Sequence, residues 1–211
     1  SGTYLSPGLS LSDAFGTVVS MPTQVRQLCD TATVDGVPPS DPTAYLVSHV
    51  GKDTPNSGTS TRPDVQITNA TGTWQLKLTR NEQLAFDSEV NGASATQPPD
   101  SHRCYKSRII AGQPAWTYPV VTVVDQFEPS HQVQLQKPYK VCEPVSIDGS
   151  PIADPAAVLT CYGMKDMSGL SPFPSVAETV ENMLGNYTVL VRARPKPQLC
   201  LPSAQTILPP A

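Results

Sequence analysis

The sequence predicts an all-β protein made of tandem, disulfide-stapled units resembling small β-sandwiches, in which strands alternate with Pro/Gly-rich loops. Three observations support this class. The 211 residues include 23 prolines and 13 glycines, spread along the chain, and these residues interrupt long helices. Only 15% of the residues are charged, and Ser, Thr, Gln and Asn carry much of the polarity, as in extracellular β-proteins. The third observation is a recurring pattern of strand, turn, strand and closing residue.

The recurring pattern is clearest in its third copy. Residues 121–127 and 133–135 alternate in polarity, which is typical of half-buried strands, and the copy closes at Cys142. In each turn a short Asp or Asn side chain can cap the backbone, and glycine, where present, can adopt positive φ. We therefore interpret the turns as hairpins rather than active sites. The other copies have turns and closing residues at 13–16 and Cys29, at 69–72 and Ala85, and at 182–185 and Cys200.

A further short strand precedes three of the turns and puts a tyrosine directly after an alanine or a cysteine. These leading strands are residues 44–47, 104–106 and 161–163. Cys104 precedes Cys142 by 38 positions, and Cys161 precedes Cys200 by 39 positions. The leading and closing cysteines of the third and fourth copies are therefore equivalent.

The second copy supports bonding between these positions. Ala44 and Ala85 replace the two cysteines there, so both are missing together. Pairing each closing cysteine with the next copy would also leave more cysteines unpaired than pairing within copies. We therefore predict disulfides within copies, which indicate an oxidising compartment. Thiolate metal ligation is the alternative, but it lacks paired Cys-x-x-Cys spacing. The predicted disulfides are Cys104–Cys142 and Cys161–Cys200.

The first copy leaves Cys29 unpaired or available for an intermolecular bond. Its leading strand would fall before Ser1, unless the segment containing Tyr4 and Leu5 replaces it. An exposed sheet edge of this kind invites another strand. The C-terminal tail, residues 204–211, is a possible source, and it would either close the fold internally or join a neighbouring subunit. The assembly candidates are Tyr4, Leu5, Thr206, Ile207 and Leu208.

The domain organisation predicted from these copies has two halves. The polar, proline-containing segment 91–101 is interpreted as a linker between them. Because three strands are too few for a core, we expect pairs of units to pack as sandwiches, with one continuous sandwich or a propeller-like ring as alternatives. The N-terminal half (1–90) contains units 1–36 and 37–90, and the C-terminal half (102–211) contains units 102–150 and 151–203 with the tail 204–211.

The pattern Cys-Tyr-Lys, Val-Thr-Val-x-Asp-Gln-Phe and Pro-x-x-x-Cys-x-Pro resembles an uncharacterised family of secreted bacterial tandem-repeat β-proteins. Residues 104–106, 121–127 and 138–144 carry this resemblance, which extends over 102–202 and more weakly over 9–90. The resemblance implies tandem extracellular β-modules and transfers no catalytic residues.

Several function classes find no support in the sequence. Gly-x-Ser-x-Gly, the phosphate loop, the dinucleotide fingerprint and Cys-x-x-Cys-His are all missing, so we predict no enzyme activity and no cofactor. The net charge of −4 and the lack of a basic face argue against nucleic acid, and no apolar run is long enough to span a bilayer. The histidines are far apart and are expected on the surface, with no metal site. They are His49, His102 and His131.

We therefore expect a secreted structural protein, a subunit of a cell-surface or extracellular fibre that assembles with copies of itself by β-strand exchange. The start at Ser1 rather than Met fits a chain that has lost a signal peptide. The alternative is an extracellular binding or adhesion module for a glycan or another surface protein, although Trp74 and Trp116 are expected in the core rather than stacked on sugar. The glycosylation patterns at Asn69 and Asn186 are interpreted as coincidental.

Overall fold

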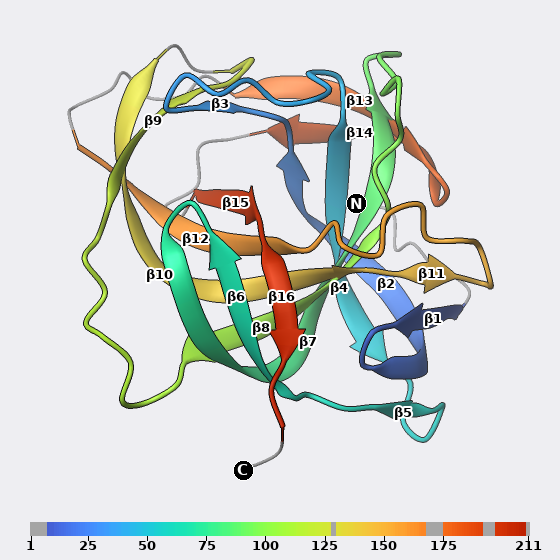
Figure 1. Ribbon diagram of the computed structural model, residues 1–211. Coiled ribbons are helices and arrows are strands. Elements are labelled where there is room, and N and C mark those ends of the chain that lie inside the picture. Colours follow the sequence, from blue (N-terminus) through green and yellow to red (C-terminus); the bar gives the residue numbers. More distant parts are fainter. Residues whose placement is uncertain (1–7, 128–129, 168–174, 192–196, 210–211) are drawn as a thin grey trace.

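The computed structural model describes residues 8–127, 130–167, 175–191 and 197–209 (Figure 1). These residues form sixteen strands in one hydrogen-bonded network and no helix, which confirms the all-β prediction. No helix that could cross a membrane is found in this part of the chain. The strands are β1 (Leu9–Asp13), β2 (Gly16–Cys29), β3 (Thr33–Val34), β4 (Tyr45–Asp53), β5 (Thr59–Ser60), β6 (Asp64–Asn69), β7 (Gly72–Val90), β8 (His102–Ile109), β9 (Val120–Val124), β10 (His131–Pro144), β11 (Ser146–Ile147), β12 (Leu159–Asp166), β13 (Val176–Asn182), β14 (Gly185–Val191), β15 (Gln198–Pro202) and β16 (Ala204–Ile207).

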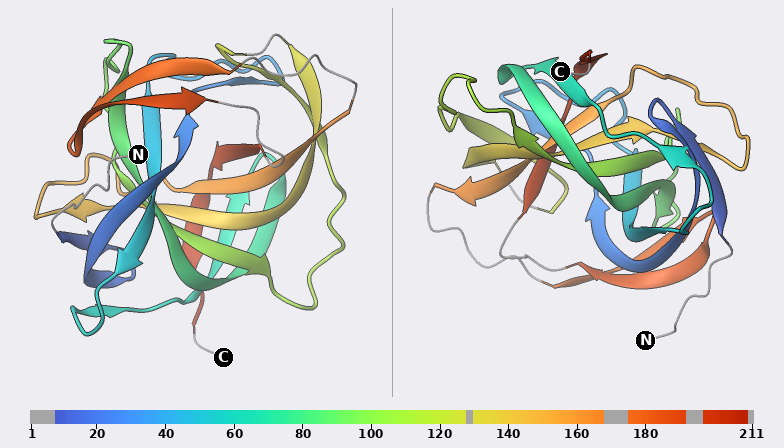
Figure 2. Two further views of the ribbon diagram at one scale, coloured as in Figure 1. Left: turned by 180° about the vertical axis from the view of Figure 1, so that it is seen from behind. Right: turned by 90° about the horizontal axis from the view of Figure 1, so that it is seen from below.

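The centre of the fold is an antiparallel sheet in the order β2-β4-β7-β8-β10-β12-β15. The long strands β2, β7 and β10 contain register shifts where they pair with β4, β8 and β12, and such bulges bend a strand and increase its twist. The sheet curls so far that β2 and β15, the strands at the two ends of this order, come near one another. Figures 1 and 2 show this from opposite sides.

Four hairpins extend from this sheet, namely β1/β2, β6/β7, β9/β10 and β13/β14. Each turn contains a hydrogen bond of the same type, in which an Asp or Asn Oδ1 accepts from the backbone N–H two residues later. Gly16, Gly72 and Gly185 follow three of the turns at positive φ, as the sequence predicts. The bonded pairs are Asp13 with Phe15, Asn69 with Thr71, Asp125 with Phe127, and Asn182 with Leu184.

Each hairpin also pairs with a segment that begins four residues after a closing position elsewhere in the chain. β11 follows the third closing residue and pairs with β1, and β16 follows the fourth and pairs with β6. β3 follows the first closing residue and pairs with β9, and the end of β7 follows the second and pairs with β13. Every hairpin therefore contacts a segment from the other predicted half.

The predicted linker, residues 91–101, does not separate two domains. It connects β7 to β8, which are hydrogen-bonded neighbours. The Asp41 carboxylate accepts hydrogen bonds from both the backbone and the hydroxyl of Thr96 and from the backbone of Gln97, at 2.7, 2.6 and 3.2 Å respectively. The two predicted halves consequently share one sheet instead of packing as separate sandwiches.

The second predicted unit needs a shift of its leading position. Ser48, not Ala44, lies opposite Ala85 in the β4–β7 pairing. Ser48 precedes the turn residue Asn69 by 21 positions, the same spacing that separates Cys104 from Asp125. The next residue, His49, therefore occupies the place of the tyrosine in the later units.

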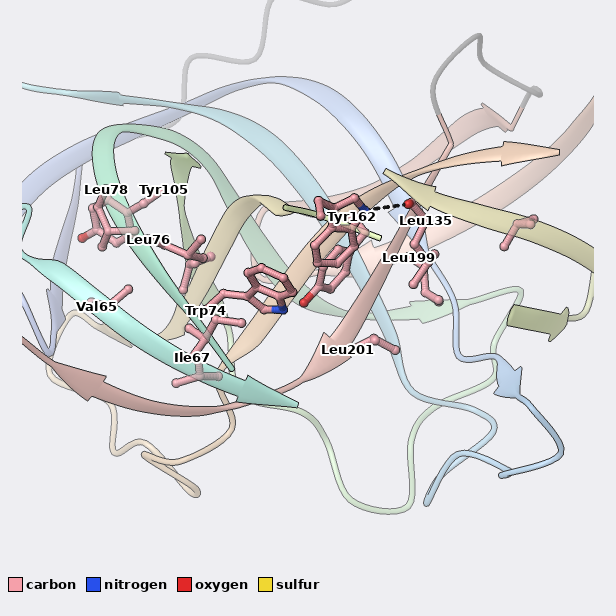
Figure 3. Packing of buried hydrophobic residues seen from close by; sticks show 14 of the residues in the cluster. Val65, Ile67, Trp74, Leu76, Leu78, Tyr105, Leu135, Tyr162, Leu199 and Leu201 are labelled. Atoms are coloured by element: carbon pink, nitrogen blue, oxygen red, sulfur yellow. Dashed lines mark hydrogen bonds between the residues drawn. The ribbon is translucent and has the colours of Figure 1, made fainter. Parts of the chain in front are cut away.

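The largest core cluster lies where the second hairpin packs against β8, β10, β12 and β15 (Figure 3). The Trp74 and Trp116 rings lie 4.9 Å apart, and Trp116 stacks on Tyr162 at 5.5 Å. The Trp116 indole N–H donates to the Leu135 carbonyl at 3.1 Å. Both tryptophans are buried, as the sequence predicts, so their indole rings are not available for stacking on sugars.

Candidate functional site

Both disulfides predicted from the sequence are present. Cys104 on β8 is bonded to Cys142 on β10, and Cys161 on β12 is bonded to Cys200 on β15. In each pair the two residues lie directly opposite on neighbouring antiparallel strands. The four cysteines pack in one cluster, so the bridges tie each leading strand to the closing strand of its own unit.

Cys29, the fifth cysteine, is free and lies at the end of β2. Its side chain is partly buried, and burial raises its pKa to about 11, with a smaller opposing effect of Lys140. The side chain of Gln198 on β15 has a further small lowering effect on this pKa. Cys29 is thus a protonated thiol at neutral pH.

Four polar residues that each lie two positions before a closing residue meet beside Cys29. The Lys140 ammonium donates to Gln83 Oε1 at 2.5 Å and to Gln198 Oε1 at 3.1 Å, and the Gln198 amide donates to Gln27 Oε1. Lys140 is 2% exposed, and burial lowers its pKa. We call Gln27, Gln83, Lys140 and Gln198 the polar cluster. Sequence reasoning missed it, although the common offset from the closing residues was visible.

The contacts within the polar cluster indicate the spacing between the strands that carry it, namely β2, β7, β10 and β15. Lys140 on β10 reaches Gln83 on β7 across β8, and it reaches Gln198 on β15 across β12. Gln198 and Gln27 make the same kind of contact, but no described strand lies between β15 and β2. The space between these two strands therefore matches the width of one strand. We call the facing edges of β2 and β15 the seam.

An acidic pair lies at one end of the seam. Asp30 directly follows Cys29, and its buried Oδ2 atom has no hydrogen-bond partner among the described residues. Burial and the nearby charge of Asp125 raise the pKa of Asp30 to about 7, and the backbone N–H of Gln126 partly opposes this effect. Asp125 is the capping residue of the third turn.

At the first turn, a leading strand supplies partners for the capping residue. Arg103, the residue before Cys104 on β8, is fully buried and contacts Asp13 Oδ2 at 3.4 Å and Asp53 Oδ2 at 2.8 Å. The Tyr105 hydroxyl donates to Asp13. The second turn follows the same plan, because the Tyr162 hydroxyl accepts from Asn69 Nδ2 at 2.8 Å. A leading strand thus caps the turn of the hairpin two units away.

The three histidines, predicted to lie on the surface, are in fact buried, with exposures of 3 to 6%. His49 contacts the Thr23 carbonyl and the Tyr187 hydroxyl, and His102 contacts the carbonyls of Asp100 and Ala157. Burial lowers the pKa of His49 and His102. Their surroundings are structural, and no group of three or more His, Cys, Asp or Glu side chains among the described residues is arranged to hold a metal ion.

The tail, predicted either to close the fold or to join another subunit, pairs within the chain. Thr206 and Ile207 lie on β16, opposite Gln66 and Val65 of β6, and the Leu208 N–H donates to the Asp64 carbonyl at 2.9 Å. Tyr4 and Leu5 lie outside the described residues. Hence the assembly candidates of the tail are already paired, whereas Cys29 lies at the seam.

Asn69 and Asn186, the two glycosylation patterns, differ in their surroundings. The Asn69 amide is engaged by Tyr162 and Ser203, and its carbonyl oxygen accepts from Thr71, so this side chain serves the turn. Asn186 is exposed on β14.

No protein-family model, curated protein or solved structure matches the chain. The resemblance to secreted tandem-repeat proteins stays a prediction.

Proposed function

We propose that this protein is a secreted structural subunit of an extracellular or cell-surface assembly, in which a β-strand from a neighbouring subunit adds to the seam. The observation that carries the proposal is the approach of the facing edges of β2 and β15. Within the described residues, every neighbouring pair in the central order is joined by a ladder, whereas its two end strands, β2 and β15, are linked by the side-chain hydrogen bond between Gln198 and Gln27. Unpaired strand edges present backbone donors and acceptors in register for another chain.

The repeated plan of the fold supports strand addition at this place. Ser48, Cys104 and Cys161 each occupy a leading strand that lies between two strands carrying closing residues. Applied to the first unit, the same plan puts a leading strand between β15 and β2. We infer that the chain consists of four copies of one unit and that a strand from a neighbouring subunit occupies this position.

The two disulfides support an extracellular location, because such bonds persist in oxidising compartments. The alternative function, a glycan-binding module, gains no specific support. Tyr118, with 41% exposure, is the one large aromatic side chain in the exposed class within the described ranges, and sugar sites usually stack on exposed aromatic rings.

The proposal is tested by the concentration dependence of assembly. Purified protein is examined by light scattering and negative-stain electron microscopy, alone and after mixing with the Cys29→Ser variant, with and without reductant. We expect ordered oligomers or fibres that grow with concentration. A protein that stays monomeric at millimolar concentration, under both redox conditions, contradicts assembly from this chain alone.

A matched pair of variants assigns the contact to the seam. Leu28→Pro removes a backbone donor from β2 next to Cys29, whereas Leu208→Pro removes the N–H that donates to the Asp64 carbonyl where the tail pairs beyond β16. Circular dichroism first establishes that both variants are folded. Assembly through the seam is lost in Leu28→Pro and retained in Leu208→Pro, and the reverse result assigns assembly to the tail.

A further inference from the structure

We propose that the paired strands β7 and β8 carry a binding surface for an acidic polysaccharide, whose sulfate or carboxylate groups contact four basic side chains. We call these four residues the basic ladder: Lys77, Arg80, Lys106 and Arg108. The surface involves neither β2 nor β15, so the inference goes beyond the proposed strand addition and does not depend on it. Three observations carry it: strand register, the lack of ion-pair partners, and the residues at equivalent positions of other units.

The register of β7 and β8 places the four cations side by side. Lys77 lies directly opposite Arg108, and Arg80 lies directly opposite Lys106. Residues directly opposite in an antiparallel pair project from the same face, with Cβ atoms about 5 Å apart, and residues two positions apart on a strand also share a face. All four residues are exposed. The whole chain has 14 Lys and Arg residues and a net charge of −4, so this is a basic face on an acidic protein.

The basic ladder is not neutralised by carboxylates of the chain. Asp64 lies opposite Lys77 on β6, and Glu82 follows Arg80 by two positions. Within the described residues, neither carboxylate forms an ion pair with a member of the basic ladder. Like charges directly opposite on neighbouring strands destabilise a sheet. The fold therefore keeps an unfavourable arrangement that an anionic ligand would relieve.

The first unit shows that the fold does not require two opposed cations at this place. Met21 lies eight positions before the closing residue of its unit, as Lys77 does in the second unit. Met21 lies opposite Lys52 in the β2–β4 pairing, where Lys77 lies opposite Arg108 in the β7–β8 pairing. The equivalent pairing thus forms with one cation instead of two.

The same comparison holds for the other positions. In the third unit, Gln134 takes the place of Lys77 and lies opposite Lys165. In the first unit, Gln24 lies five positions before the closing residue, as Arg80 does in the second. Uncharged side chains therefore serve the fold at both positions, and we assign the cations of the second unit to binding.

Charge and location indicate the class of ligand. Arginine and lysine bind anionic groups through charge-assisted hydrogen bonds. Gln75 lies on the same face, two positions before Lys77, and its Oε1 accepts from Gln113 Nε2 at 3.2 Å. These amides continue the surface with groups that can bond to sugar hydroxyls. The two disulfides support an extracellular location, where acidic polysaccharides are common polyanions.

Other ligands fit this surface less well. A DNA duplex is bound through many phosphate contacts, and outside the basic ladder it would meet a chain of net negative charge. Neutral sugars are usually held by stacking on exposed aromatic rings, whereas ionic contacts to an acidic polysaccharide need no such ring. A short stretch of an extended acidic polysaccharide therefore matches the basic ladder best.

Sequence reasoning missed the basic ladder because its members lie in two separate segments. Lys77 and Arg80 are interspersed with residues of β7 that face the core, and Lys106 and Arg108 alternate with buried residues of β8. Only the pairing of the two strands brings the four together. The lack of a basic run in the sequence thus did not exclude a basic face.

The experiment measures binding of a heparin octasaccharide and an octagalacturonate by isothermal titration calorimetry at a series of salt concentrations. Maltooctaose is the neutral control, and a single-stranded oligonucleotide of matched charge tests for binding of any polyanion. Wild type is compared with the double variant Lys77→Gln/Arg80→Gln. The matched control, Lys137→Gln/Lys165→Gln, removes two exposed cations of the third unit. Light scattering records the oligomeric state of the same samples.

We expect Lys77→Gln/Arg80→Gln to bind the preferred acidic oligosaccharide about tenfold more weakly, and the control variant to change the affinity less than about threefold. For the heparin octasaccharide, the slope of log affinity against log salt concentration should fall by about two, one for each cation lost. Urea denaturation should show the double variant to be at least as stable as wild type, because it removes like-charge repulsion.

Binding of either acidic oligosaccharide that depends on Lys77 and Arg80 supports the inference, and the tighter probe identifies sulfate or carboxylate as the preferred group. Equal losses of affinity in the two double variants, binding no tighter than that of maltooctaose, or tighter binding of the oligonucleotide would overturn it. A protein that binds these probes but never assembles refutes only the proposed assembly. A protein that assembles without binding them refutes only the polysaccharide surface.

Discussion

At the residue scale, the fold depends on charged groups held away from water by specific partners. Arg103, fully buried, contacts Asp13 and Asp53, and its guanidinium lies 5.0 Å from the centre of the Tyr105 ring. Breaking a buried ion pair is costly because it leaves an uncompensated charge in a poorly solvated place. The contact between the first hairpin and β8 therefore rests on this group.

Replacing Arg103 by Met should lower the free energy of unfolding by about 3–5 kcal/mol, since Asp13 and Asp53 lose their cation. Urea denaturation followed by circular dichroism measures the change. Arg62, which is exposed, provides a matched control, and Arg62→Met should alter stability by no more than about 0.5 kcal/mol. Similar losses of unfolding free energy in the two variants would show that the buried ion pairs of Arg103 do not stabilise the fold more than an exposed arginine does.

Two carboxyl groups should make stability depend on pH. Burial raises the pKa of Asp30 and of Glu143 to about 7 each, from values of 3.8 and 4.5. The folded state then binds more protons than the unfolded state between about pH 4 and 7. The stability that these groups contribute is thus present at low pH and is lost as pH rises to 7.

Glu143→Gln and Asp30→Asn should each remove part of this dependence. The test compares each variant with the wild type at pH 4.5 and pH 8, because the lowered pKa of His49 and His102 acts in the opposite direction and cancels in the difference. Each variant should gain stability relative to wild type at the higher pH. A difference that does not change with pH would contradict raised pKa values in the folded state.

At the element scale, the hairpins are defined by local chemistry but positioned by neighbours. Gly16 and Gly72 both follow a turn at positive φ, +135° and +115°. A Cβ on Gly16 would lie 2.1 Å from the Thr59 carbonyl oxygen, because β5 pairs with the start of β2. A Cβ on Gly72 would meet nothing closer than the Trp74 side chain at 3.6 Å.

Gly16→Ala should therefore destabilise the protein more than Gly72→Ala, by about 2 kcal/mol, since both strain the backbone and only the first collides with another strand. Thermal and urea unfolding of the two variants gives the difference. Equal losses would indicate that β5 does not pack on β2 in solution.

At the scale of the whole molecule, pairing between distant segments makes the chain a single structural unit. β1 pairs with β11, β3 with β9, β6 with β16 and β7 with β13, and each ladder joins the predicted N-terminal half to the C-terminal half. These contacts leave neither half with its own complete set of strand partners.

The chain should accordingly unfold in one cooperative transition, with coincident curves by near- and far-ultraviolet circular dichroism. Limited proteolysis should not begin within residues 91–101, because Asp41 binds Thr96 and Gln97. Early cleavage there, or two separate transitions, would restore the description of two domains joined by a linker.

Local chemistry made several features predictable from the chain alone. The turn at Asn69 depends on a hydrogen bond to Thr71 two residues away, and the alternation along 133–135 reports which side chains face the core. The cysteine pairs were found from spacing and from their joint absence in the second unit, although Ser48 and not Ala44 is the partner position. The Asn-Gly pair at 91–92 forms a tight turn with a bridge between Val90 and Ala93, and this turn signal, rather than the polar composition of 91–101, describes the segment correctly.

Long-range pairing decided the rest. Whether the tail closes on β6 or leaves the molecule depends on which strand edge is open, and no local pattern around Thr206 reports that. The burial of His49 and the meeting of Gln27 with Gln198 likewise result from how the sheet curls. Hydrogen bonds within a turn join residues close in sequence, whereas the seam is formed by β2 and β15, which lie far apart in the sequence and meet only because the sheet curls.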